Sequence, residues 1–197
     1  MKKNYLIIAL FLLVLVNGCS KTVVPVASSE GSVWTALDGK YLTSCFPIDE
    51  GVYGRYFTEL NNGVQYMAML VYGDSEDCSS EYVLVSTADE EVISEPFAAY
   101  EFSPLTITGM PENIIALSSV SLVEGLNDMV YFVSLEEEGG AISLLLGNDI
   151  DIGICSTWSE CTTEHPDLVA YADDPFTMPD GLDTDDYNYL YASHVDD

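Results

Sequence analysis

The sequence predicts an all-β fold, an antiparallel up-and-down barrel of about eight strands. Between residues 33 and 150, short runs rich in β-branched and aromatic residues recur at intervals of about eight to twelve residues, with turn residues between them. Two of the separating segments have the composition of hairpin turns. No window of about a dozen residues in this region carries an apolar stripe with a helical period. A β-sandwich has the same rhythm of strands, so it remains the alternative architecture.

Two turn sequences indicate where neighbouring strands begin and end. Asn61-Asn62-Gly63 predicts a tight turn between strands at 53–60 and 64–72, because Asn and Gly adopt positive φ at little cost. Segment 136–140, with three Glu and two Gly, predicts a second hairpin. Strands such as 66–71 are apolar on both faces, which predicts a sheet packed inside and partly covered outside, or an oligomer contact. The other predicted strands are 41–46, 82–86, 99–103, 105–108, 114–123, 129–135 and 141–146.

The start of this region resembles small lipocalin-like bacterial lipoproteins. Trp34 lies near the start, Gly39 comes just before the first strand, and Cys45 lies near the end of that strand. The lipocalin opening has Gly two residues before the Trp, whereas here Ser32 holds that place and Gly31 is one residue away. The resemblance implies a lipocalin-like barrel over 33–150 that encloses a small apolar ligand, with inward Tyr, Met and Phe side chains as its lining.

The composition of the chain limits which kinds of partner it can bind. The chain has 197 residues, 48% of them hydrophobic and 19% charged, which suits one folded domain and excludes wholesale disorder. Lys and Arg number 5 against 33 Asp and Glu, a formal net charge of −28. Such a surface repels a phosphate backbone, so we expect no nucleic-acid partner.

The N-terminus has the pattern of a secretory signal peptide. Lys2 and Lys3 precede an apolar run from Tyr5 to Val16, which is too short to cross a bilayer. The run ends in Val16-Asn17-Gly18-Cys19, which resembles the lipobox of bacterial lipoproteins. The resemblance implies that 1–18 is a lipoprotein signal peptide and that Cys19 becomes the lipidated first residue. The alternatives are an ordinary signal peptide or an N-terminal membrane anchor.

Residues 19–32 have the composition of a tether, which we expect to be a lipidated linker between the membrane and the barrel. The lipid anchor makes the membrane the first expected partner and predicts a location in the cell envelope. In bacterial lipoproteins, Asp directly after the lipidated cysteine commonly retains the protein at the inner membrane. Ser20 holds this position here, which favours the outer membrane.

Four cysteines remain in the mature chain: Cys45, Cys78, Cys155 and Cys161. An even number in an exported protein predicts two disulfides, with three pairings open. We favour Cys45–Cys78 and Cys155–Cys161, because each pair lies within one local region. A zinc site built from Cys155, Cys161 and His165 is the alternative, although its spacing is unlike that of the usual zinc motifs.

Residues 151–197 are predicted to be an acidic, loop-rich C-terminal extension. Its segment 187–191 has three Tyr at a period of two, which favours an added edge strand or frayed terminus over a strip that stacks on a sugar or partner. Four aspartates surround Gly181, but their order does not match an EF-hand. We therefore expect nonspecific Ca²⁺ binding to an acidic surface. The four are Asp180, Asp183, Asp185 and Asp186.

No motif indicates catalysis, and the sequence predicts neither a catalytic residue, a metal site nor a cofactor. The chain has only two His and lacks a nucleophile elbow, a zinc-protease helix and a Gly-rich phosphate loop. We therefore expect a non-enzymatic envelope lipoprotein that binds a small apolar ligand in its barrel. The alternative is an interaction or structural protein of the envelope that uses its acidic surface or the tyrosines at 187–191.

Overall fold

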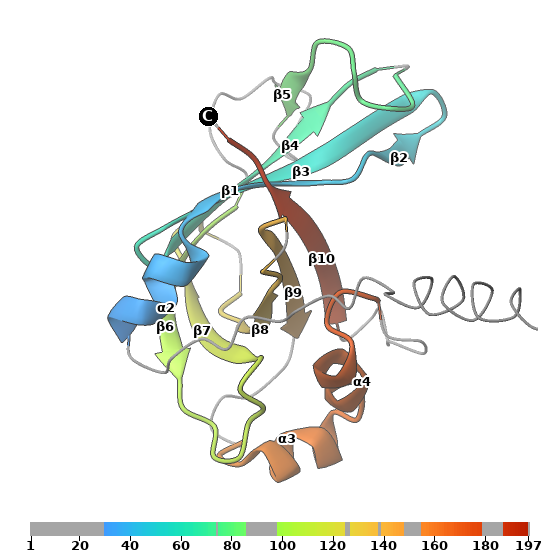
Figure 1. Cartoon of the computed structure of the whole chain (residues 1–197). Helices are drawn as coiled ribbons and strands as arrows, with labels where there is room; N and C mark the ends of the chain where they lie inside the picture. Colours follow the sequence, from blue (N-terminus) through green and yellow to red (C-terminus); the bar gives the residue numbers. More distant parts are fainter. Residues whose placement is uncertain are drawn as a thin grey trace, which may run out of the picture.

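The computed structural model describes residues 30–73, 75–85, 98–124, 127–137, 139–147, 155–178 and 187–196 (Figure 1). The predicted signal peptide 1–18, the predicted lipidation site Cys19 and residues 20–29 of the predicted tether lie outside these ranges. The first described element is helix α2, Glu30–Leu37, so the last residues assigned to the tether are helical. Among the described helices, none has the length and apolar character needed to cross a membrane.

Eight strands form a closed antiparallel barrel. Each pairs with the next in chain order, and the last pairs with the first, so the barrel has no free edge. The predicted all-β, up-and-down barrel is confirmed, and the alternative of a β-sandwich is wrong. The barrel strands are β1 (Gly39–Thr43), β3 (Val52–Asn61), β4 (Val64–Val71), β6 (Ala98–Leu105), β7 (Ile115–Ser121), β8 (Val130–Leu135), β9 (Ala141–Gly147) and β10 (Tyr187–His194).

Strand β10 corrects the expected role of the C-terminal region. It lies between two partners, with Tyr41 of β1 opposite His194 and Leu145 of β9 opposite Tyr189. The segment predicted as an edge strand or frayed terminus is therefore the strand that closes the barrel. The barrel is not confined to 33–150, because the strand that completes it comes from the region assigned to the extension.

The same region holds two short helices where loops were expected, α3 (Trp158–Glu164) and α4 (Asp167–Asp173). Helix α3 begins with a capping box. The Glu160 backbone N–H donates to Thr157 Oγ1, and the Glu160 carboxylate accepts from the Thr157 N–H. The Ser156 hydroxyl and N–H also donate to the Glu160 carboxylate, and these two bonds, followed by the bond from the Thr157 N–H, lower its pKa.

Both predicted hairpins are confirmed. At the turn between β3 and β4, Asn62 has φ 48° and Gly63 has φ 85°, as a tight two-residue turn requires. The sequence predicted two strands, 99–103 and 105–108, separated at Pro104. The structure has one strand here, β6, which continues through Pro104 and ends at Leu105. On the side away from β7, the last backbone bond of β6 runs from the Phe102 N–H to the Gly63 carbonyl. At Pro104, β6 pairs only with β7, so the missing N–H leaves no ladder bond unmade on the other side.

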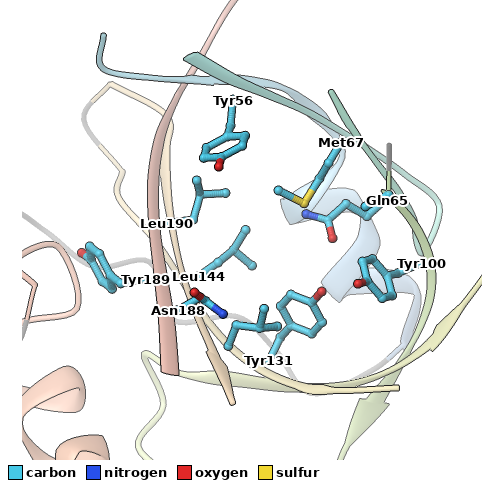
Figure 2. A pocket seen from close by; sticks show the side chains of 11 residues that line it. Tyr56, Gln65, Met67, Tyr100, Tyr131, Leu144, Asn188, Tyr189 and Leu190 are labelled. Atoms are coloured by element: carbon cyan, nitrogen blue, oxygen red, sulfur yellow. The ribbon is translucent and has the colours of Figure 1, made fainter. Parts of the chain in front are cut away.

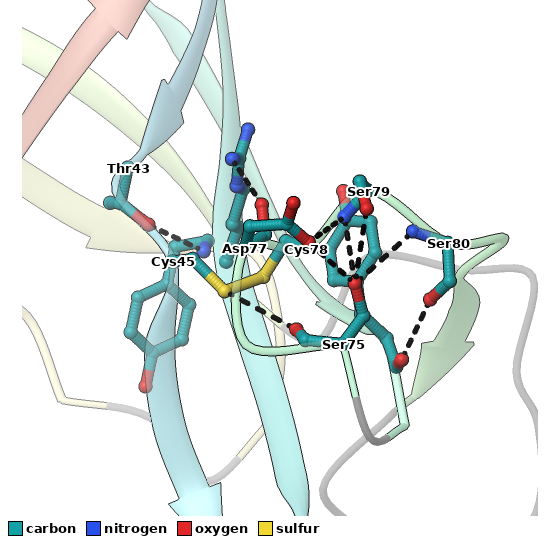
Figure 3. The surroundings of a disulfide bond; sticks show 10 residues. Thr43, Cys45, Ser75, Asp77, Cys78, Ser79 and Ser80 are labelled. Carbon is teal, nitrogen blue, oxygen red and sulfur yellow. Dashed lines mark hydrogen bonds between the residues drawn. A yellow bond between two sulfur atoms is a disulfide. The ribbon is translucent and has the colours of Figure 1, made fainter.

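Strands β3 and β4 are longer than the barrel wall and extend from one end of it (Figure 1). Their outer parts pair with β2 (Phe46–Asp49) and β5 (Val83–Val85), which form a small sheet extension of the barrel. The Cys45–Cys78 disulfide lies at this extension, with the two Cα atoms 5.8 Å apart (Figure 3). Its loop is held by local bonds; the Ser79 N–H donates to Asp77 Oδ1 at 3.1 Å and to Ser75 Oγ at 2.9 Å.

Apolar side chains pack on both sides of the barrel wall. Inside, Trp34 and Leu37 of α2 join side chains from the strands, so this helix fills the barrel end near the β3–β4 turn. Outside, α3 and α4 cover another cluster that includes Phe132, Leu145 and Tyr171. Every residue of β8 is consequently buried. The sequence predicted strands that are covered on both faces, and β8 confirms this. Segment 66–71, which suggested the prediction, lies in β4, and there Tyr66 is exposed.

Candidate ligand-binding cavity in the barrel

A cavity of about 260 Å³ lies inside the barrel (Figure 2). Side chains from six strands line the cavity. Helix α2 packs against the inner core, which lies farther along the barrel interior from the cavity. On β8, for example, Tyr131 lines the cavity while Val133 and Leu135 belong to the core beside α2. The lining residues are Tyr56, Gln65, Met67, Ala98, Tyr100, Tyr131, Leu144, Leu146, Asn188, Tyr189 and Leu190.

The alternation of β4 decides which side chains reach this cavity. Gln65 and Met67 face the interior, and Tyr66 between them is 41% exposed on the outside. Residues 64–72 have a period of two, but the period alone does not say which face is inside. The apolar Tyr66 faces outward and the polar Gln65 inward, the reverse of what a hydrophobic pattern predicts, so sequence reasoning missed Gln65.

Gln65 is the exceptional residue of the cavity. Its side chain is 0% exposed, and neither Nε2 nor Oε1 has a hydrogen-bond partner among the described residues. Figure 2 shows its amide pointing into the cavity, between Met67 and Tyr100. A buried polar group left without a partner costs about 1–3 kcal/mol of stability. An amide in this position is therefore suited to hydrogen-bonding a molecule inside the cavity.

Two tyrosines lie next to this amide. Tyr100 of β6 is directly opposite Gln65 in the strand register, and its ring meets that of Tyr131 edge-on at 5.8 Å between centroids. Burial raises the pKa of Tyr131, and the neighbouring Tyr100 raises it further. Burial also raises the pKa of Tyr100. Both phenols stay protonated at neutral pH, so each can donate or accept a hydrogen bond.

The rest of the wall is mostly apolar, and one part of the rim is exposed. Met67, Leu144 and Leu190 point into the cavity in Figure 2. Asn188 is exposed and lies at the rim. An apolar wall with a few convergent polar groups is the usual composition of a small-molecule site.

The C-terminal tyrosines do not form a free stacking strip. The Tyr189 ring packs edge-on against Tyr171 of α4, and its hydroxyl donates to the Pro175 carbonyl at 2.7 Å. The Tyr191 ring packs in the same way against Phe176. These rings fasten the helical segment to the outside of the barrel.

The remaining sequence-predicted residues lie elsewhere. Cys45–Cys78 and Cys155–Cys161 are both disulfides, which confirms the preferred pairing and makes the zinc alternative wrong, because both its cysteines are oxidised. The aspartates at 180–186 lie outside the described residues. In the part of the chain that the structure describes, no cluster of three or more His, Cys, Asp or Glu could hold a metal ion.

An eight-stranded barrel is just wide enough for its side chains to fill it or to hold one small ligand. This chain belongs to the class of small closed up-and-down β-barrels with an internal cavity, and its architecture is consistent with the lipocalin-like resemblance. No protein-family model matches the chain, and neither a curated protein nor a solved structure matches it.

Proposed function

We propose that this protein is a non-enzymatic lipoprotein of the cell envelope, anchored to the outer membrane through Cys19, whose barrel binds one small, largely apolar ligand. The observation that supports ligand binding is the barrel cavity itself. Side chains from six strands leave a space of about 260 Å³ that the inner core does not fill. Drug-sized ligands occupy pockets of about 300–1,000 Å³, so the guest of this cavity is smaller, about the size of a single ring or a short acyl chain.

Native mass spectrometry of the lipoprotein, extracted from its own membrane in detergent, tests the ligand. We expect a guest of low mass on the wild-type protein. Leu190→Trp places a larger side chain in the cavity and should remove the guest. The control Val120→Trp changes a residue that is 56% exposed on the barrel exterior and should keep it. A guest retained equally by both variants would place it outside the barrel.

The anchor is supported by the sequence Val16-Asn17-Gly18-Cys19 and has its own test. The intact mass of the wild-type protein should correspond to a chain that begins at Cys19 and carries acyl chains. In Cys19→Ser the acyl mass should disappear, whereas the control Ser20→Ala should keep it. An unacylated wild-type chain would contradict the lipoprotein assignment and leave ligand binding by the barrel untouched.

A second candidate function is binding of an envelope protein, which one feature of the barrel exterior favours. On the outer face, Tyr66 of β4 is paired with Ala99 of β6, and Leu122 donates its N–H to the Ala99 carbonyl from the other side. Val120 of β7 is paired with Glu101, two residues farther along β6. Tyr66, Val120 and Leu122 are 41%, 56% and 52% exposed. Apolar residues gathered on neighbouring strands often mark a protein contact. Cross-linking in intact cells tests this, because Val120→Asp/Leu122→Asp should abolish a specific cross-linked product that Leu190→Trp preserves.

A further inference from the structure

We propose that the ligand of the barrel is an uncharged molecule that presents a hydrogen-bond donor and acceptor side by side, such as a primary amide or a lactam, and that the Gln65 side chain pairs with it. This inference rests on the proposed function, and it names the chemistry of the ligand.

The amide of Gln65 sets the first requirement. It offers N–H donors at Nε2 and an acceptor at Oε1, and both are buried, unpaired among the described residues and directed into the cavity (Figure 2). A ligand with an adjacent acceptor and donor satisfies both atoms at once. A carboxylate only accepts and leaves Oε1 without a donor, and an ammonium only donates and leaves Nε2 without an acceptor.

Charge sets the second requirement. None of the described residues lining the cavity is a Lys, Arg, His, Asp or Glu. A charged ligand would lose its hydration there without gaining a counter-charge. The strongly acidic chain adds repulsion for an anion, with 33 Asp and Glu against 5 Lys and Arg. The Tyr100 and Tyr131 phenols remain neutral, since burial raises the pKa of both.

The wall sets the third requirement. Met67, Leu144 and Leu190 are apolar, and the faces of Tyr56 and Tyr131 are aromatic. Within about 260 Å³ they suit a compact body of one ring or a short chain. The ligand thus has an apolar body toward these residues and a polar group at Gln65.

Four ring compounds that differ mainly in their polar group separate these requirements: benzamide, benzoate, benzylammonium and ethylbenzene. Each is titrated into the full lipidated protein in micelles at neutral pH, with ¹³C-labelled methionine methyl groups observed by NMR. Met67 lies in the cavity wall and reports binding, and Met110 in the outer cluster under α3 and α4 is the internal control. We expect benzamide to bind most tightly, with an affinity about tenfold or more above that of each of the other three. A difference in affinity of about tenfold is what the hydrogen bonds of one amide pair contribute.

Gln65→Leu and Gln65→Met remove the amide and keep an apolar side chain of similar size. Both should weaken benzamide about tenfold or more while ethylbenzene binds at least as well as before. Two variants are used so that a folding defect in one leaves the other as a test, and the Met110 signal reports folding in both. Equal loss of benzamide and ethylbenzene, no loss of either, or tighter binding of a charged compound to the wild type would overturn the inference.

The two proposals fail in different ways. If ethylbenzene shifts the Met67 methyl signal but benzamide has no advantage, the cavity binds apolar ligands and the role of Gln65 is wrong. If none of the four compounds shifts Met67 in the wild type, the cavity holds only water or its own side chains, and the proposed function fails together with the inference.

Discussion

The hydroxyl of Tyr171 in α4 lies 2.9 Å from the carbonyl oxygen of Phe132 in β8, and at the same distance from the carbonyl of Ser143 in β9. Tyr171 is fully buried, and its single O–H proton is shared between backbone carbonyls of two neighbouring strands. One side chain thus connects the C-terminal helices to the barrel wall. This explains why a segment rich in acidic residues is an ordered cover of β8 and β9.

Tyr171→Phe should destabilise the protein by about 1–3 kcal/mol, because it removes the donor from two buried carbonyls without changing the packed ring. Urea unfolding measures this. Tyr189→Phe is the matched control: its hydroxyl also donates to a carbonyl, that of Pro175, but it is only half-buried. We expect a smaller loss for the control, and equal losses would contradict the special role of Tyr171.

The two disulfides should differ in their contribution to stability. Cys45 and Cys78 are 33 residues apart in the chain and Cys155 and Cys161 only 6. The loop-entropy model assigns about 4 kcal/mol to the longer loop and about 2 kcal/mol to the shorter one. Paired Cys→Ala variants of each bridge, compared by urea unfolding, should show the larger loss for Cys45→Ala/Cys78→Ala. The reverse order would mean that local packing outweighs loop length.

Gly63→Ala should destabilise the β3–β4 hairpin for two reasons. Its φ of 85° is unfavourable for Ala, and an added Cβ would lie 3.2 Å from the indole of Trp34. Gly51→Ala is the control, since φ is 72° there but no atom lies within 4 Å of an added Cβ. Positive φ alone costs a non-Gly residue about 1–2 kcal/mol. Calorimetry should therefore show a larger drop in Tm for Gly63→Ala, and equal drops would exclude a role for the contact with Trp34.

Tyr41 should make the stability depend on alkaline pH. Burial, and then the nearby Asp38, raises its pKa to about 12, while its hydroxyl donates to the Leu37 carbonyl at 2.8 Å. In the unfolded chain its pKa is about 10. Its contribution is therefore fully present below a pH of about 10 and is lost as the pH rises toward about 12.

Unfolding free energies of the wild type and Tyr41→Phe, measured at several pH values between about 8 and 11, test this. The pKa of other buried tyrosines is also raised, so their contributions to stability change with pH in the same direction. The difference between the wild type and the variant therefore isolates the contribution of Tyr41. We expect the wild type to be more stable below pH of about 10 and its advantage to shrink above it. An advantage that is constant over this range would contradict the raised pKa.

Much of the fold could be predicted because its signals are local. Asn62 and Gly63 specify a tight turn by their tolerance of positive φ, and the residues on either side pair as a consequence. The pairing of Cys45 with Cys78 was favoured because both lie in one region of the chain, but the sequence left the other two pairings open. The candidate site could not be predicted this way, because Gln65 is distinguished only by the face of β4 on which it lies.

The strand-rich architecture and the two hairpins are local properties of the sequence, since turn conformations and alternating side chains act over a few residues. The disulfide pairing was favoured by the positions of the cysteines in the chain, and the structure confirmed it. The insertion of β10 between β1 and β9, and the inward position of Gln65 rather than Tyr66, depend on contacts between distant parts of the chain. Closure of a barrel joins residues some 150 positions apart, such as Tyr41 and His194. Which face of a strand is buried depends on that closure, because the inside exists only once all eight strands are paired.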